Sequence, residues 1–262
     1  SKCSSSDQFE KCESLGPDGE VAFRQFSSGT TGHPKGILLT HDALIHYMEI
    51  TKDALACTPD DVTVGWLPLH HDMGLITQLL HPLFCRQRSV LLNPSDWLAK
   101  PQSLFQAVDR YRGTISWMPN FAFNYCTRRI PAEHLEGLDL SSWRILGCGS
   151  EPVQIEALEA FKKTFKSYGL KPDALKIAYG LAEHVAGVTL TPHDKSPEVD
   201  WVRKKELGLL QALPADFDAP DSIPIMSCGY PKPTVEVLIV NETGAVNCDR
   251  EVGEVLLKID NS

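Results

Sequence analysis

Short apolar runs alternate along the chain with longer segments whose apolar residues recur every three or four positions. The short runs predict buried strands at residues 62–67, 89–92, 114–117, 143–146, 175–178 and 185–190. The longer segments predict helices at residues 42–56, 74–84, 102–112, 121–129 and 153–168. Strands that alternate with helices of this length pair in parallel, and helices cover both faces of their sheet. The pattern therefore predicts an α/β fold with a parallel-rich sheet layered with helices.

The pattern changes at about residue 191, after which prolines recur and interrupt any helix. Strands are predicted at residues 223–226, 234–240 and 252–259, the last two joined through a turn at Asn241-Glu242-Thr243-Gly244. These short strands favour a smaller antiparallel β unit. We therefore expect a poorly ordered lead-in at residues 1–20, an α/β core at 21–190 and the start of a β subdomain at 191–262.

One polar stretch lies between two predicted strands, residues 21–26 and 36–39. It reads Ser27-Ser28-Gly29-Thr30-Thr31-Gly32-His33-Pro34-Lys35-Gly36. Glycines let backbone N–H groups face one point, hydroxyls add donors, and Lys35 adds a positive charge; together they suit a phosphate. The stretch is not the usual P-loop, because Pro34 stands where the second glycine belongs. A flexible hairpin tip is the alternative on composition alone.

Further polar stretches follow four of the predicted strands. They are His70-His71-Asp72-Met73-Gly74, Pro119-Asn120, Gly147-Cys148-Gly149-Ser150-Glu151-Pro152 and Tyr179-Gly180-Leu181-Ala182-Glu183-His184. Ligands of open α/β sheets bind beyond the carboxyl ends of the strands, so five loops on one rim predict one shared cleft. Taken singly, each stretch has a structural alternative as a helix start or a strand-ending turn. Zinc binding is disfavoured because no third ligand has a suitable spacing, and no Gly-x-Ser-x-Gly elbow accompanies the His-Asp pair.

Composition narrows the class of protein. Apolar residues make up 42% and charged residues 23% of the chain, as in ordinary soluble globular proteins. The net charge of −9, with no basic block, argues against nucleic acid as a partner. No apolar run approaches the length of a transmembrane segment, and the first residues do not resemble a signal peptide. None of the eight cysteines forms a Cys-x-x-Cys pair, so we expect free thiols and a cytoplasmic protein.

The complete motifs resemble those of the adenylate-forming superfamily. Residues 27–36 match its signature Thr/Ser-Ser-Gly-Thr/Ser-Thr-Gly-x-Pro-Lys-Gly throughout. The stretch from Trp66 to Leu75 is similar to the Leu-Pro-x-x-His-Asp-Met-Gly-Leu motif of the fatty acyl-AMP ligase branch. Tyr179-Gly180-Leu181-Ala182-Glu183 resembles that branch's version of Tyr-Gly-x-Thr-Glu, and Ser227-Cys228-Gly229-Tyr230-Pro231 resembles the start of the superfamily's β subdomain. The resemblance spans roughly residues 21–258.

The resemblance implies that a fatty acid and ATP, with Mg²⁺, form an acyl-adenylate and pyrophosphate. It assigns Ser27, Ser28, Gly29, Thr30, Thr31 and Gly32 to the phosphates, and Gly149, Ser150, Glu151, Tyr179 and Gly180 to the adenine slot. Lys35 would add charge at the end of the loop or be an ordinary solvated lysine, and Glu183 would hold Mg²⁺. His71, Asp72, Asn120 and Phe121 would meet the acid, with His71, Glu183 and Lys35 as the catalytic set. Ile76, Leu79, Phe121 and Phe123 would line an acyl tunnel or serve core packing.

The match departs from the superfamily in two respects. Ala182 replaces the Thr of the general motif, as in the fatty acyl-AMP ligase branch. No residue here matches the family's ribose-binding Asp or the lysine of its C-terminal lid, so we expect a central fragment of a larger enzyme that is inactive alone. The long segment 197–225, with Val202-Arg203-Lys204-Lys205-Glu206-Leu207, favours transfer of the acyl group to a carrier protein. A fatty acyl-CoA synthetase and a non-catalytic scaffold domain are the alternatives.

Overall fold

The computed structural model describes residues 20–27 and 35–259, so the predicted lead-in at 1–20, apart from Glu20, and loop residues 28–34 lie outside the described part. Its centre is a sheet of seven described strands in the order β11-β8-β7-β6-β5-β3-β4. The strands from β4 to β7 pair in parallel, as predicted, and β8 and β11 add antiparallel pairs at one edge. The strands are β3 (Val62–Gly65), β4 (Arg88–Leu91), β5 (Ile115–Pro119), β6 (Ile145–Gly149), β7 (Leu175–Gly180), β8 (Gly187–Leu190) and β11 (Tyr230–Pro231).

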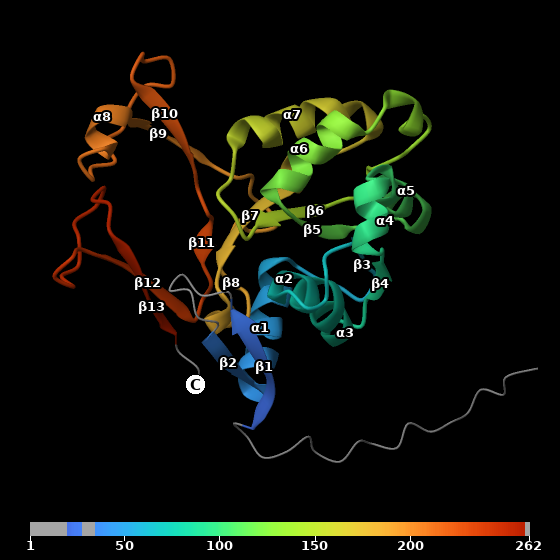
Figure 1. Ribbon diagram of the computed structural model, residues 1–262, viewed down its shortest axis with the longest axis horizontal. Coiled ribbons are helices and arrows are strands. Elements are labelled where there is room, and N and C mark those ends of the chain that lie inside the picture. Colours follow the sequence, from blue (N-terminus) through green and yellow to red (C-terminus); the bar gives the residue numbers. More distant parts are fainter. Residues whose placement is uncertain (1–19, 28–34, 260–262) are drawn as a thin grey trace, which may run out of the picture.

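Helices cover both faces of this sheet (Figure 1), which explains why β3 and β6 are buried along their whole lengths. On one face lie α5, α6 and α7, whose buried aromatic side chains pack together around Phe105, Phe161 and Phe165. On the other face lie α1, α2 and α3. These helices are α1 (His41–Ala54), α2 (Asp72–Leu75), α3 (His81–Phe84), α5 (Gln102–Tyr111), α6 (Asn120–Arg129) and α7 (Ile155–Phe165); a short helix, α4 (Pro94–Ala99), was not predicted.

The chain enters the fold through the antiparallel hairpin of β1 (Val21–Ser27) and β2 (Lys35–Thr40), as the sequence predicts. This hairpin is a sheet of its own and not part of the central sheet. Thr40 caps α1 by accepting a hydrogen bond from the Ala43 backbone N–H at 3.2 Å, which confirms the predicted helix start. Leu39 packs in a small apolar cluster with Tyr47 of α1 and with Val185, so the hairpin rests on α1 and on the chain after β7.

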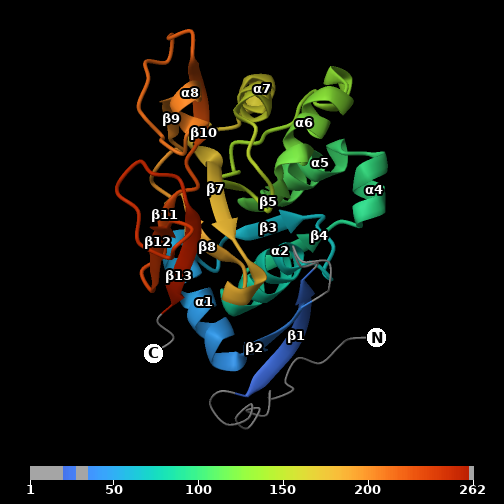
Figure 2. The same ribbon diagram turned by 60° about the vertical axis from the view of Figure 1, so that its left-hand side comes forward.

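The C-terminal part consists of short antiparallel strands, shown at one side of the sheet in Figures 1 and 2. Strands β9 (Val199–Arg203) and β10 (Ser222–Met226) pair with each other, and so do β12 (Val235–Val240) and β13 (Glu254–Ile259). The sequence predicts β10, β12 and β13 but misses β9 and the short helix α8 (Lys204–Leu207). Strand β11, which lies after residue 191, pairs with β8 at the edge of the central sheet.

The predicted helix at residues 74–84 is more complex than its pattern suggests. It begins earlier, at Asp72, and α2 passes into α3 through one π-helical turn, Ile76–Leu80. Pro82, four residues after Gln78, has no N–H to donate to the Gln78 carbonyl, and the Ser89 hydroxyl donates to that carbonyl at 2.6 Å. The fully buried Gln78 side chain lies over Gly65, where a Cβ atom would come within 2.1 Å of its Oε1. The predicted strand at 62–67 therefore ends at Gly65.

One buried ion pair joins several elements at the end of the sheet opposite the predicted rim. Asp61, 4% exposed, lies 2.6 Å from an Arg144 nitrogen and accepts a hydrogen bond from Thr114 at 2.7 Å. Arg144 also donates to the backbone oxygens of Leu55 and Ala56, just after α1. Burial acts to raise the pKa of Asp61, but these hydrogen bonds outweigh it, and the pKa lies below the ordinary Asp value.

Candidate active site

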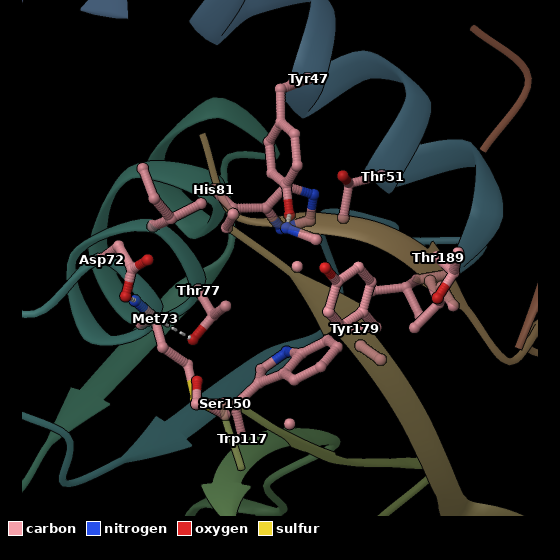
Figure 3. Close-up of a pocket in the computed structure, with 18 of the residues that line it drawn as sticks. Tyr47, Thr51, Asp72, Met73, Thr77, His81, Trp117, Ser150, Tyr179 and Thr189 are labelled. Atoms are coloured by element: carbon pink, nitrogen blue, oxygen red, sulfur yellow. Dashed lines mark hydrogen bonds between the residues drawn. The ribbon is translucent and has the colours of Figure 1, made fainter. Parts of the chain in front are cut away.

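A cavity of about 70 Å³ lies beyond the carboxyl ends of the parallel strands, between the central sheet and α1. Its walls come from α1, the α2–π segment, β5, β6, β7 and β8. Figure 3 shows Tyr47, Thr51 and His81 on one side of this cavity and Ser150 and Trp117 on the opposite side. The position agrees with the rule that open α/β sheets bind ligands beyond the carboxyl ends of their strands.

Five of the residues predicted from the sequence line this cavity: Asp72, Gly149, Ser150, Tyr179 and Gly180. Ser150 has φ +70°, a backbone conformation that residues other than glycine seldom adopt and that recurs at functional loops. Tyr179 is 38% exposed, so one face of its ring is free to contact a ligand. At Gly180 a Cβ atom would meet the Ala186 oxygen at 2.0 Å, so the close approach of β8 already requires glycine there.

Three other predicted residues lie apart from this cavity. Asn120, Phe121 and Glu151 line a separate, open hollow at the start of α6. There the Phe121 N–H donates to Glu151 Oε1 at 2.5 Å, and the Gln154 N–H donates to Asn120 Oδ1 at 2.9 Å. These bonds hold the loop after β6 against the start of α6, and this structural role was not foreseen.

His71 and Asp72 form a pair at the start of α2. His71 Nδ1 lies 2.7 Å from Asp72 Oδ1, and the Met73 N–H donates to the same oxygen at 2.6 Å. The His71 side chain is 57% exposed and does not pack in the core. The hydrogen bond to Asp72 raises the pKa of His71 above its ordinary value despite partial burial. The other ring nitrogen, Nε2, makes no hydrogen bond to the described residues and is available as a donor.

Glu183 lies in the short 3₁₀ turn Ala182–His184, and its side chain is exposed. Val185, which follows this turn, has φ +63°, an unusual conformation for a β-branched residue. Strand β2 packs against the turn, and Ser27 and Lys35 pair across the hairpin that carries the signature loop. The hairpin and the Glu183 turn are therefore neighbours, although the loop residues Ser28–Gly32 lie outside the described part.

The donor set at this turn fits magnesium better than a transition metal. The described residues contain no cluster of three or more His, Cys, Asp or Glu side chains placed to hold a metal ion. Magnesium keeps several waters and needs only one or two protein carboxylates beside substrate phosphates. The exposed carboxylate of Glu183 meets that requirement on its own.

Sequence reasoning missed the side of the cavity opposite Ser150. Tyr47, Thr51, His81 and Lys232 line it, and Trp117 lines the wall between β5 and β6. Tyr47 and Thr51 belong to the helix predicted at residues 42–56, and nothing in the sequence around Lys232 indicates that this lysine is buried. Of the four residues considered for an acyl tunnel, Ile76 lines the cavity, whereas Phe123 is fully buried in the core.

An open α/β sheet with a cavity beyond the carboxyl ends of its parallel strands defines a class of fold that binds small ligands at that rim. The chain belongs to the AMP-binding enzyme family, whose model matches residues 2–261. This membership confirms the resemblance to adenylate-forming enzymes and explains the sheet with its appended antiparallel strands.

Relatives with described functions are similar over most of the chain. The medium-chain-fatty-acid–[acyl-carrier-protein] ligase JamA of Moorena producens is 37% identical over 90% of this chain and 40% of its own length. The long-chain-fatty-acid–AMP ligase FadD32 of Mycobacterium marinum is 34% identical over 92% of this chain and 39% of its own. A fatty acyl-adenylate ligase from L. pneumophila, solved with acyl adenylate and pyrophosphate, has a TM-score of 0.86 at 36% identity, covering 92% and 42%. The chain thus spans about two-fifths of these proteins.

Proposed function

We propose that this chain forms the nucleotide- and acid-binding part of an ATP-dependent ligase that activates fatty acids as acyl-adenylates. The observation that carries the proposal is the cavity at the sheet rim, where Asp72, Gly149, Ser150 and Tyr179 meet beside the Glu183 turn. The similarity to fatty acyl-AMP ligases supports it.

The chemistry of the reaction explains why such a site needs no general base. A fatty acid is already a carboxylate at neutral pH, so its oxygen can attack the α-phosphorus of ATP directly. The carboxylate–phosphorus bond forms as the bond to the pyrophosphate oxygen breaks, and pyrophosphate leaves with the bonding electrons. Two anions must approach each other, so catalysis consists of positioning and compensation of charge.

Each group of residues would contact a different part of the two substrates. Tyr179 would stack on adenine, and the Gly149–Ser150 backbone would follow its edge. His71, held as a donor by Asp72, would orient the acid's carboxylate through Nε2. Glu183 would bind Mg²⁺, which supplies positive charge against the phosphates. The signature loop would hold those phosphates through its N–H groups and hydroxyls, with Lys35 at its end.

The acceptor and the compartment are part of the proposal. We propose that the acyl group is transferred to the phosphopantetheine arm of a carrier protein, because JamA and other relatives are named as acyl-carrier-protein ligases. Transfer to coenzyme A is the alternative. Among the described residues, no helix is both long and apolar enough to cross a bilayer. The six cysteines among the described residues are free, four of them buried, which is consistent with a cytoplasmic enzyme.

Pyrophosphate exchange in the natural full-length protein tests the proposal. Fatty-acid-dependent exchange into ATP is expected, and Glu183→Gln should lower it by about tenfold or more, because one carboxylate held against a metal-bound phosphate is lost. Glu133→Gln, at an exposed carboxylate of the 3₁₀ turn Ala132–His134, is the matched control and should leave the rate unchanged. Absence of exchange with acids of every length would reject the proposal in favour of a scaffold domain.

A further inference from the structure

Lys232 is a buried lysine in the wall of the cavity, and the activation chemistry does not use it. Lys232 is 4% exposed, and its backbone N–H donates to the Val188 backbone oxygen at 3.1 Å. The ammonium donates to Thr51 Oγ1 at 2.7 Å and lies 3.7 Å from the centroid of the Tyr47 ring. No carboxylate of the described residues lies within ion-pair distance of it.

The groups around Lys232 do not supply the missing negative charge. Burial and, to a smaller extent, the Lys232 charge together lower the pKa of His81 to about 4, so that imidazole is neutral. The pKa of His184 is lowered for the same two reasons, and both of its ring nitrogens lack a hydrogen-bond partner. Tyr47 offers its ring face, while its hydroxyl oxygen accepts from the Gly187 N–H at 2.9 Å. A hydroxyl and an aromatic face compensate a buried cation only in part, and burial lowers the pKa of Lys232 below the ordinary lysine value.

The lysine lies on the side of the cavity opposite Ser150. Its partners Tyr47 and Thr51 are on one side in Figure 3, and Ser150 is on the other. Apolar groups, including those of Ile76 and Ala178, line the walls between these sides. The cavity therefore has a polar rim where adenylation would occur, apolar walls, and a cation at its far end.

This arrangement selects for a ligand with two polar ends. A plain aliphatic acid would place its terminal methyl group against a desolvated ammonium, whereas an anionic terminus would pair with it. We propose that the acid activated in this cavity carries a second carboxylate at the end of its chain, and that Lys232 binds this carboxylate. The inference rests on the proposed function, because it takes the acid's reacting carboxylate to lie beside His71 and Asp72, on the side of the cavity where Met73 contacts Ser150.

The test compares acids of equal chain length that differ only at the far end. In the natural full-length protein, pyrophosphate exchange is measured with unbranched monocarboxylic acids, the matching α,ω-dicarboxylic acids and the matching ω-hydroxy acids, over a ladder of lengths. At the length that fits best, kcat/KM should favour the diacid over the monoacid by about tenfold or more, with the hydroxy acid between them.

Two variants test whether Lys232 causes the preference for the diacid. Lys232→Met keeps the length of the side chain but removes its charge, so the diacid preference should disappear or invert. Lys163→Met removes an exposed charge from α7, far from the cavity, and should leave the preference unchanged. The ratio of kcat/KM for the diacid to kcat/KM for the monoacid is measured on the wild type, so the proposal stays testable even if Lys232→Met fails to fold.

The outcomes separate this inference from the proposed function. Pyrophosphate exchange at equal rates with monoacids and diacids would overturn the role of Lys232. A diacid preference that is unchanged in Lys232→Met would overturn it as well. Both results would leave the proposed ligase function intact. If calorimetry shows that the diacid binds to the wild type but not to Lys232→Met, and no acid supports pyrophosphate exchange, then Lys232 binds an anion but the proposed ligase function is wrong. A preference for the ω-hydroxy acid over the diacid overturns the second carboxylate.

Discussion

At the scale of single residues, the behaviour of His71 is set by its neighbour Asp72. The carboxylate accepts from His71 Nδ1 and from the Met73 N–H, which orients the imidazole and leaves Nε2 toward solvent. The pKa of Asp72 is lowered, because hydrogen bonds from His71 and Met73 outweigh the opposing effect of burial. The imidazolium therefore persists to higher pH than in an isolated histidine, which suits a group that must attract a carboxylate.

Replacing Asp72 should change the pH dependence of acid binding. In Asp72→Asn, the pKa of His71 should fall back toward about 6.5, because the charged acceptor is gone. The alkaline limb of kcat/KM for the acid should then move to lower pH, with a parallel shift in the NMR titration of His71. His70→Gln, at the exposed neighbour, is the control and should leave the profile in place. If the alkaline limb of the kcat/KM profile stays fixed while the pKa of His71 measured by NMR falls, His71 does not take part in acid binding.

At the scale of elements, the ion pair of Asp61 and Arg144 ties the end of α1 to β3, β5 and β6. Asp61 precedes β3, Arg144 precedes β6, and Thr114 precedes β5, so one cluster aligns three strand starts. The carboxyl ends of the same strands carry the rim loops. The cluster therefore helps to set the register in which those loops converge.

Removing one partner of this pair should destabilise the fold. Asp61→Asn leaves the Arg144 guanidinium without its carboxylate, and the free energy of unfolding in urea should fall by about 3 kcal/mol or more. Asp139→Asn removes the exposed pair with Arg112 and serves as the control, with little change expected. Equal urea midpoints for both variants would show that the buried pair does not stabilise the sheet.

The pH dependence of stability follows from the same group. Because the folded-state pKa of Asp61 is lowered, its stabilisation is present above the ordinary Asp pKa of about 3.9 and is lost as the pH falls through the lower folded value. The difference in unfolding free energy between wild type and Asp61→Asn should therefore be constant near neutral pH and shrink below about pH 4. A difference that grows on acidification would contradict this assignment.

Elements with a regular pattern could be predicted, and those fixed by tertiary contacts could not. The parallel strands and the helices α1, α5, α6 and α7 follow from periodicity and caps. The π turn depends on the packing of Gln78 over Gly65, which no local pattern records. Strand β8 was grouped with the alternating strands but runs antiparallel, because only the short 3₁₀ turn Ala182–His184 separates it from β7.

At the scale of the whole molecule, the site forms where three parts of the chain meet: the sheet rim, the hairpin and the antiparallel C-terminal part. Topology predicts the rim residues Ser150 and Tyr179, since parallel strands bring their carboxyl ends together. The expectation of five loops on one sheet was wrong in one respect, because the hairpin approaches from its own sheet and rests on α1. Lys232 could not be predicted, since its place depends on how the segment after β11 packs against α1.

Hydrogen exchange tests the shared site most directly. A non-hydrolysable acyl-adenylate analogue, an acyl-sulfamoyl adenosine, is added to the natural full-length protein, and amide protection is read segment by segment. The account predicts joint protection of three segments distant in sequence, residues 71–73, 149–151 and 179–183, at a single ligand concentration. Protection confined to one of them, with the other two unchanged at saturation, would contradict it.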